Sequence, residues 1–98
     1  GYDVRALRFL ALYEEIVDSP RFRERAPDYS HKLYHFFLCE CAPGAHAAPS
    51  ELDIHQEGVQ WIELGEMLAL PLRPARVRDC LPALLASDTP AFLGSDHV

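Results

Sequence analysis

Three arginines alternate along a short stretch that is rich in charge and in proline. They are Arg21, Arg23 and Arg25, and the surrounding residues 19–30 read SPRFRERAPDYS. Proline at two positions predicts a surface loop, and a guanidinium on such a loop can hold a phosphate group through two hydrogen bonds. Two interpretations stay open: a phosphate-binding loop, and a solvated loop whose positive charge offsets a negative protein.

Cysteines and histidines form a second group with chemical potential. Cys39 and Cys41 are one residue apart, whereas paired zinc ligands usually have two to four residues between them. We therefore expect buried thiols and no metal site. His35 stands within an apolar pattern, which favours a hydrogen-bonded core histidine over a ligand or general base. A metal or redox protein using these residues and His31 is the least favoured alternative.

Length and composition limit the classes of protein. The chain has 98 residues, of which 49% are apolar and 24% charged, with a formal net charge of −6. These values predict one folded domain, and the negative charge argues against binding to nucleic-acid polymers. No apolar run approaches the ~20 residues of a membrane span, so no membrane association is expected. An odd number of cysteines and the lack of a signal-peptide pattern favour a cytoplasmic protein.

The patterning of apolar residues predicts the elements that position these side chains. The segment His31–Cys41 is aromatic and free of Gly and Pro, which predicts a strand with both faces mostly covered. Ala42–Gly58 is a polar connection, and Val59–Leu64 is expected to be a short strand. Residues 2–18 are ambiguous, because their apolar spacing fits a helix slightly better than a strand.

A helix is predicted from Pro74 to Ala86, since proline suits the first turn and an apolar stripe follows at helical spacing. Pro82 interrupts this pattern, so we expect a kink there or a second short helix from Leu81. In the tail, residues 91–93 are apolar enough to dock, whereas Gly94–Val98 is expected to fray.

The order of these segments resembles the second half of a Nudix (MutT-like) hydrolase domain. The resemblance lies in Trp61 on the expected strand, Glu66 after it, the Leu-rich turn at residues 68–72 and the final helix. Residues 1–4, Gly-Tyr-Asp-Val, resemble the end of the family's signature helix. This implies an α+β fold, a partial Nudix-like α/β/α sandwich with a mixed sheet and a C-terminal helix, formed by residues 1–98 as one C-terminal portion. It also implies a strand over Ala6–Ile16, against the local pattern.

The same resemblance implies a chemistry. Nudix enzymes hydrolyse nucleoside diphosphates linked to another group, with Mg²⁺ or Mn²⁺ held by glutamates of the signature helix. That helix would precede residue 1, so the 98 residues alone are expected to be inactive and to hold no metal. Glu14 with Asp18, and Glu63 with Glu66, are poor replacements, because neither pair would lie on one helical face.

Individual residues acquire roles under this resemblance. Glu57 matches a loop carboxylate that serves some family members as metal ligand or general base. Arg21, Arg23 and Arg25 become candidate contacts to the substrate phosphates, and Tyr13 and Phe36 become candidate stacking partners for the base. A solvated loop carboxylate is the competing interpretation of Glu57.

A function of another class also fits the sequence. A sandwich that lacks part of its elements leaves apolar faces uncovered, and such faces and free sheet edges promote pairing with another copy. The alternative to a hydrolase is therefore a non-catalytic, self-associating interaction module. On either hypothesis the 98 residues are expected to form a homodimer or larger assembly, including by domain swapping.

Overall fold

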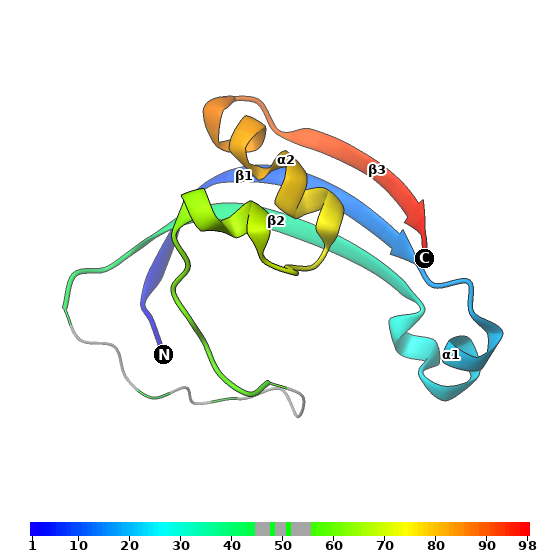
Figure 1. The fold of residues 1–98 in the computed structure, drawn as a ribbon. Helices are drawn as coiled ribbons and strands as arrows, with labels where there is room; N and C mark the ends of the chain where they lie inside the picture. The colour runs from blue at the N-terminus through cyan, green and yellow to red at the C-terminus, as the bar shows by residue number, and fades with distance from the viewer. Residues whose placement is uncertain (45–47, 49–50, 52–55) are drawn as a thin grey trace.

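A computed structural model describes residues 1–44, 48, 51 and 56–98 (Figure 1). Three strands and two helices make up its regular structure, together with two short 3₁₀ segments. In chain order they are β1 (Val4–Ile16), α1 (Pro20–Arg25), η1 (Pro27–Tyr29), β2 (His31–Cys41), η2 (Leu64–Ala69), α2 (Ala75–Ala86) and β3 (Ala91–His97). The predicted α+β class is confirmed, whereas the Nudix-like sandwich stays a prediction.

The strands form one mixed sheet in the order β2-β1-β3. β1 pairs antiparallel with β2, from Val4 opposite Cys41 to Ile16 opposite His31. It pairs parallel with β3, so that Ile16 also lies beside His97. β1 is therefore the central strand, and hydrogen bonding to two neighbours explains why a segment with helical apolar spacing is extended.

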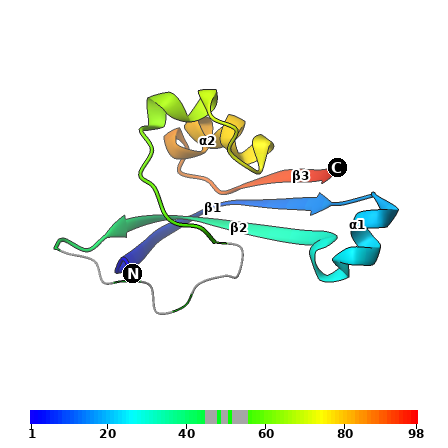
Figure 2. The same cartoon turned by 60° about the horizontal axis from the view of Figure 1, so that its bottom comes forward.

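Helix α2 covers one face of the sheet (Figure 2). Its Leu84 is 5% exposed and forms the core with Leu10 and Ala11 of β1. Arg8 reinforces this contact, because its Nη2 donates a hydrogen bond to the carbonyl oxygen of Leu84 at 2.8 Å. The helix runs without a break through Pro82, so the expected second helix from Leu81 is wrong.

Residues 59–64 are not the expected strand. Residues 59–63 are coil and Leu64 begins η2, and Val59 and Trp61 are 69% and 71% exposed. Trp61 instead contacts the N-terminal residues, since its Nε1 donates to the hydroxyl of Tyr2 at 3.0 Å. A strand forms only by pairing with another strand, and residues 59–64 pair with no strand in the described part of the chain.

The end of the chain does not fray. Residues 91–97 form β3. Val98 continues the ladder through hydrogen bonds to Ile16, the last residue of β1, and to Asp18, which follows that strand. Its N–H donates to the carbonyl of Ile16 at 2.9 Å, and its own carbonyl accepts from the N–H of Asp18 at 2.9 Å. Gly94 has φ +85°, a conformation that glycine adopts without steric cost, and it lies where the pairing of β3 with β1 is irregular.

The face of the sheet opposite α2 is apolar and exposed, contrary to the expectation that both faces of β2 are covered. We call it the open face. Leu33 and Phe37 of β2 are 57% and 54% exposed, and Phe92 of β3 is 66% exposed. On the same face lie Phe9, Leu12, His35, Cys39 and Cys41. His35 and both cysteines are exposed, so the expected buried roles of these three residues are wrong.

Among the described residues, no helix combines the length and the apolar character needed to cross a bilayer.

The packing of Leu84 in the core predicts how much stability is lost when its side chain is shortened. Replacing Leu84 by Ala removes the α2 side chain that packs on Leu10 and Ala11, so we expect the free energy of unfolding to fall by about 2–5 kcal/mol. Leu68→Ala is the matched control, because Leu68 is 54% exposed and leaves no cavity. Urea unfolding followed by circular dichroism measures both changes. Equal losses in the two variants would contradict this account of the core.

Candidate functional site

The three arginines lie on or at the end of a short helix rather than on an irregular loop. Ser19 begins α1 because its Oγ accepts a hydrogen bond from the N–H of Phe22 at 3.3 Å, and Pro20 occupies the first turn. Arg21 and Arg25 are four residues apart, which places them on one side of the helix. The sequence pattern missed this helix because two prolines and alternating charge favoured a loop.

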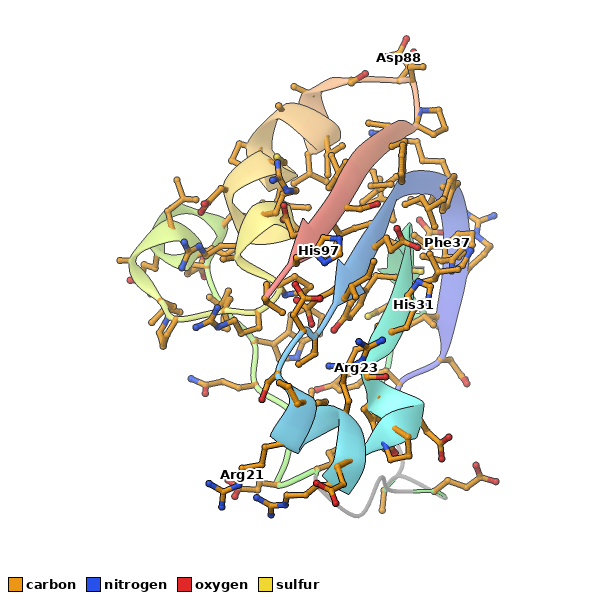
Figure 3. All side chains as sticks on the ribbon, turned by 90° about the vertical axis from the view of Figure 1, so that its right-hand side faces the viewer. Arg21, Arg23, His31, Phe37, Asp88 and His97 are labelled. Atoms are coloured by element: carbon orange, nitrogen blue, oxygen red, sulfur yellow. The ribbon has the colours of Figure 1, made fainter. Side chains whose placement is uncertain are left out.

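The structure separates the three guanidinium groups. Arg21 and Arg25 line one open surface hollow together with Ser19, Phe22 and Ala26, and Arg23 is not part of its lining. Figure 3 shows Arg21 pointing away from the sheet and Arg23 lying toward it. All three side chains are exposed. Two cations on one side of a helix, without a carboxylate in the hollow's lining, can receive an anionic group.

Tyr13 lies on the α2 face, where it is 2% exposed. Its hydroxyl donates a hydrogen bond to Oδ2 of Asp96 at 3.0 Å. Burial, together with the hydrogen bond to Asp96, raises the pKa of Tyr13 to about 12. Its ring stacks on Tyr34, which in turn stacks on Phe36, with ring centroids 5.8 and 5.9 Å apart. The two candidate stacking residues thus belong to one aromatic row, in which Tyr13 is engaged by protein on all sides.

Asp96 links this row to the helix above it. Arg76 of α2 donates two hydrogen bonds to the carboxylate, from Nε at 2.6 Å and from Nη2 at 2.5 Å. The guanidinium holds the pKa of Asp96 below its ordinary value, and the hydroxyl of Tyr13 acts in the same direction. This network joins β1, β3 and α2, which indicates a structural role for Tyr13.

A second group of polar side chains gathers at one end of the open face, and we call it the polar cluster. Glu14 is its centre: it accepts a hydrogen bond from Ser95 Oγ at 2.5 Å and lies 2.7 Å from Nε2 of His31. Beside it, Nδ1 of His97 lies 2.9 Å from the carboxylate of Asp18. Figure 3 shows His31 on the side of the sheet away from α2. One carboxylate therefore connects all three strands.

The electrostatics of the polar cluster favour a charged, structural Glu14. The hydrogen bonds from Ser95 and His31 lower the pKa of Glu14, so the group is a weak base. No group of three or more His, Cys, Asp or Glu side chains within the described ranges could hold a metal ion. Glu14 lies on β1 and Asp18 beyond its end, as expected for a pair that does not share a helical face.

The remaining acidic candidates lie outside these clusters. Glu57 is exposed in the coil before η2, and Glu63 immediately precedes that segment. Two further acidic residues precede Glu57 in the same polar connection: Glu51 is exposed as well, and Asp53 lies outside the described residues. The role of Glu57 as metal ligand or general base stays a prediction.

Comparison with family models, with curated proteins and with solved structures gave no match.

The pairing of Asp96 with Arg76 predicts how stability depends on pH. A carboxyl group whose pKa is lowered on folding stabilises the native state above its ordinary pKa of 3.8. That stabilisation is lost as the pH falls through the lowered value. Asp96→Asn should therefore lower the midpoint of thermal unfolding at pH 7 and flatten its decline below about pH 4. Part of the decline in the unfolding midpoint at acid pH should remain, because the pKa of Glu14 is also lowered on folding.

Asp79→Asn is the control, because Asp79 pairs with Arg78 on the outer part of the same helix and its side chain is 58% exposed. Thermal unfolding followed by circular dichroism between pH 2 and pH 7 compares the variants. The same acid profile for both substitutions would show that the pair of Asp96 and Arg76 does not contribute as described.

Proposed function

We propose that residues 1–98 are the C-terminal part of a Nudix-type (MutT-like) hydrolase domain that acts on nucleoside diphosphate-linked substrates. The open face is the observation that carries this proposal. One helix covers one side of a mixed sheet, while Leu33, Phe37 and Phe92 stay exposed on the other. An apolar face of this kind fits one half of a sandwich whose second layer comes from other polypeptide.

The proposal divides the chemistry between two parts of the domain. Mg²⁺ or Mn²⁺, held by glutamates of a signature helix outside residues 1–98, would activate the water and polarise the diphosphate. We assign no metal ligand within the described residues, where no suitable group of three side chains is found. Glu57 is proposed as an auxiliary carboxylate, and a cytoplasmic location belongs to the same proposal.

Residues 1–98 would supply substrate contacts. Arg21 and Arg25 share one hollow on α1, and both are exposed in a chain of net charge −6. Guanidinium groups bind phosphate oxygens in a planar, two-bond geometry that gives orientation as well as affinity. We propose these two arginines as the phosphate contacts, with Arg23 outside the set. Phe36 and Tyr13 are weaker candidates for base stacking, because both rings are packed in the aromatic row.

Because the proposed metal ligands lie outside residues 1–98, these residues alone are expected to be inactive. With Mg²⁺ or Mn²⁺ and a panel of nucleoside diphosphate derivatives, the 98-residue chain should release no phosphate or nucleotide above the metal-only control. Product formation is measured by chromatography of the nucleotides. Turnover by these residues alone would contradict the proposal. So would coding sequence upstream of residue 1 that lacks a glutamate-rich helix.

The arginine hollow predicts a binding difference within α1. Arg21→Gln with Arg25→Gln should weaken binding of ADP by at least about tenfold, because two charge-assisted contacts are lost. Arg23→Gln removes the same type of charge from the same helix and should change affinity less than about twofold. NMR titration at low ionic strength measures both. Equal weakening would show a general effect of charge and not a defined contact.

The open face also favours a second candidate function, a self-associating interaction module. Exposed apolar patches of this kind mark interaction surfaces in proteins of known structure. A homodimer or larger assembly is compatible with the hydrolase proposal, since an enzyme domain can also associate. Sedimentation that shows a compact monomer at micromolar concentration would contradict self-association.

A further inference from the structure

β2 lies at one edge of the sheet, and within the described part of the chain it pairs with β1 alone. It is eleven residues long and contains neither Pro nor Gly. Its Lys and acidic residues are confined to Lys32 and Glu40, near the two ends. Natural sheets protect their edges with short strands, prolines, bulges or central charges. The pairing of β1 with β2 has two register shifts, but the extra residues at both, Leu7 and Leu10, belong to β1. The outer edge of β2 itself therefore has none of these protections.

The other edge of the sheet is different. β3 is seven residues long, and its pairing with β1 is irregular near Gly94, whose φ is +85°. It also carries Asp96, which is engaged with Arg76 and Tyr13. A short, irregular and charged strand is a poor template for a further strand. The comparison points to β2 as the edge available for pairing.

The hydrogen bonds at the ends of β2 define which backbone groups face outward. The carbonyl of Ser30 accepts from the N–H of Val17, and the N–H of Ala42 donates to the carbonyl of Asp3, both at 2.8 Å. Backbone groups alternate in direction along an antiparallel strand. Even-numbered residues of β2 therefore bond to β1, and odd-numbered residues from His31 to Cys41 present their N–H and C=O groups to the free edge.

We propose that β2 pairs antiparallel with β2 of a second copy of this chain, about a two-fold axis at Phe36. This register matches odd residues with odd residues, as hydrogen bonding across the new edge requires. It also overlaps the whole strand, because His31 then lies opposite Cys41. Lys32 lies opposite Glu40 of the second copy, and the two-fold axis repeats this arrangement of opposite charges. Within one copy Lys32 pairs with Glu15 and Glu40 pairs with Arg5, so the new contact joins two existing ion pairs into one network.

The same register joins the open faces of the two copies. His35 lies opposite Phe37, and Leu33 lies opposite Cys39, all on the side away from α2. Cross-strand pairs of this kind stabilise a sheet through contact of their side chains. The result is a six-stranded sheet with both α2 helices on one side. This inference makes the proposed self-association specific, and it is independent of the hydrolase proposal.

The test uses one substitution at the edge and one on the open face. His35→Pro removes an N–H that points to the free edge, so the ladder with β1 keeps its hydrogen bonds. We expect this variant to raise the dimer dissociation constant at least about a hundredfold, since it interrupts the centre of the new ladder. Phe92→Lys changes the open face outside β2 and should shift the constant less than about threefold. Sedimentation velocity measures dissociation, and circular dichroism measures the fold.

A cross-link provides a readout that does not depend on His35→Pro. Leu33→Cys, with Cys41→Ser and Cys80→Ser, places a new thiol opposite Cys39 of the second copy. Hydrogen-bonded partners in antiparallel strands have Cα atoms about 5.5 Å apart, a separation that a disulfide spans. Copper–phenanthroline and oxygen, which accept the two electrons, should give a covalent dimer. Adding Cys39→Ser should abolish the cross-link. The two thiols that remain, at position 33 of each copy, would then lie six residues apart along the paired strands, or about 20 Å.

Each outcome has a defined meaning. Loss of the dimer in His35→Pro with its retention in Phe92→Lys, or the specific cross-link, supports the edge pairing. Dissociation by Phe92→Lys alone, with no cross-link, overturns the edge pairing but keeps self-association through the open face. A wild-type chain that stays monomeric at micromolar concentration overturns both. None of these results depends on catalytic turnover.

Discussion

The fold depends on β1 being hydrogen-bonded along both edges while its two faces meet different surroundings. One edge receives β2 and the other receives β3. On the face under α2 lie Leu10, Ala11 and Tyr13, which are the buried residues of β1. On the other face the sheet exposes aromatic and aliphatic side chains. The strand thus holds the only buried part of the sheet among the described residues and, at the same time, part of its most exposed apolar surface.

Much of the fold was predictable where local composition and final structure agree. The bounds of β2 were predicted correctly, because an uninterrupted aromatic run without Gly or Pro has few alternatives to a strand. The start of α2 was predicted from Pro74 and the apolar stripe after it. β1 required the family resemblance, since its apolar spacing alone favoured a helix. In these segments the side chains that define the pattern also make the contacts.

The errors came from segments whose structure depends on distant partners. Residues 94–97 contain glycine, serine, aspartate and histidine, and become a strand only by pairing with β1. Without β3, the polar cluster could not be foreseen, because Ser95 and His97 meet Glu14 and Asp18 from far along the chain. Residues 59–64 show the reverse case, in which a strand-like pattern pairs with no strand of the sheet. Local pattern cannot reveal which edge of a sheet is occupied.

The network of Tyr13, Asp96 and Arg76 has a consequence for the order of folding. Asp96 of β3 contacts Tyr13 of β1 and Arg76 of α2. Neither of these two contacts can form before residues 91–97 have left the ribosome. Until then β1 has only one neighbouring strand, and α2 lacks its ion pair. Contacts between residues far apart in the sequence, such as Tyr13 and Asp96, are slow to form and leave intermediates exposed. The nascent chain should therefore present the aromatic hairpin of β1 and β2 to chaperones until β3 has been translated, and complete this sheet only afterwards.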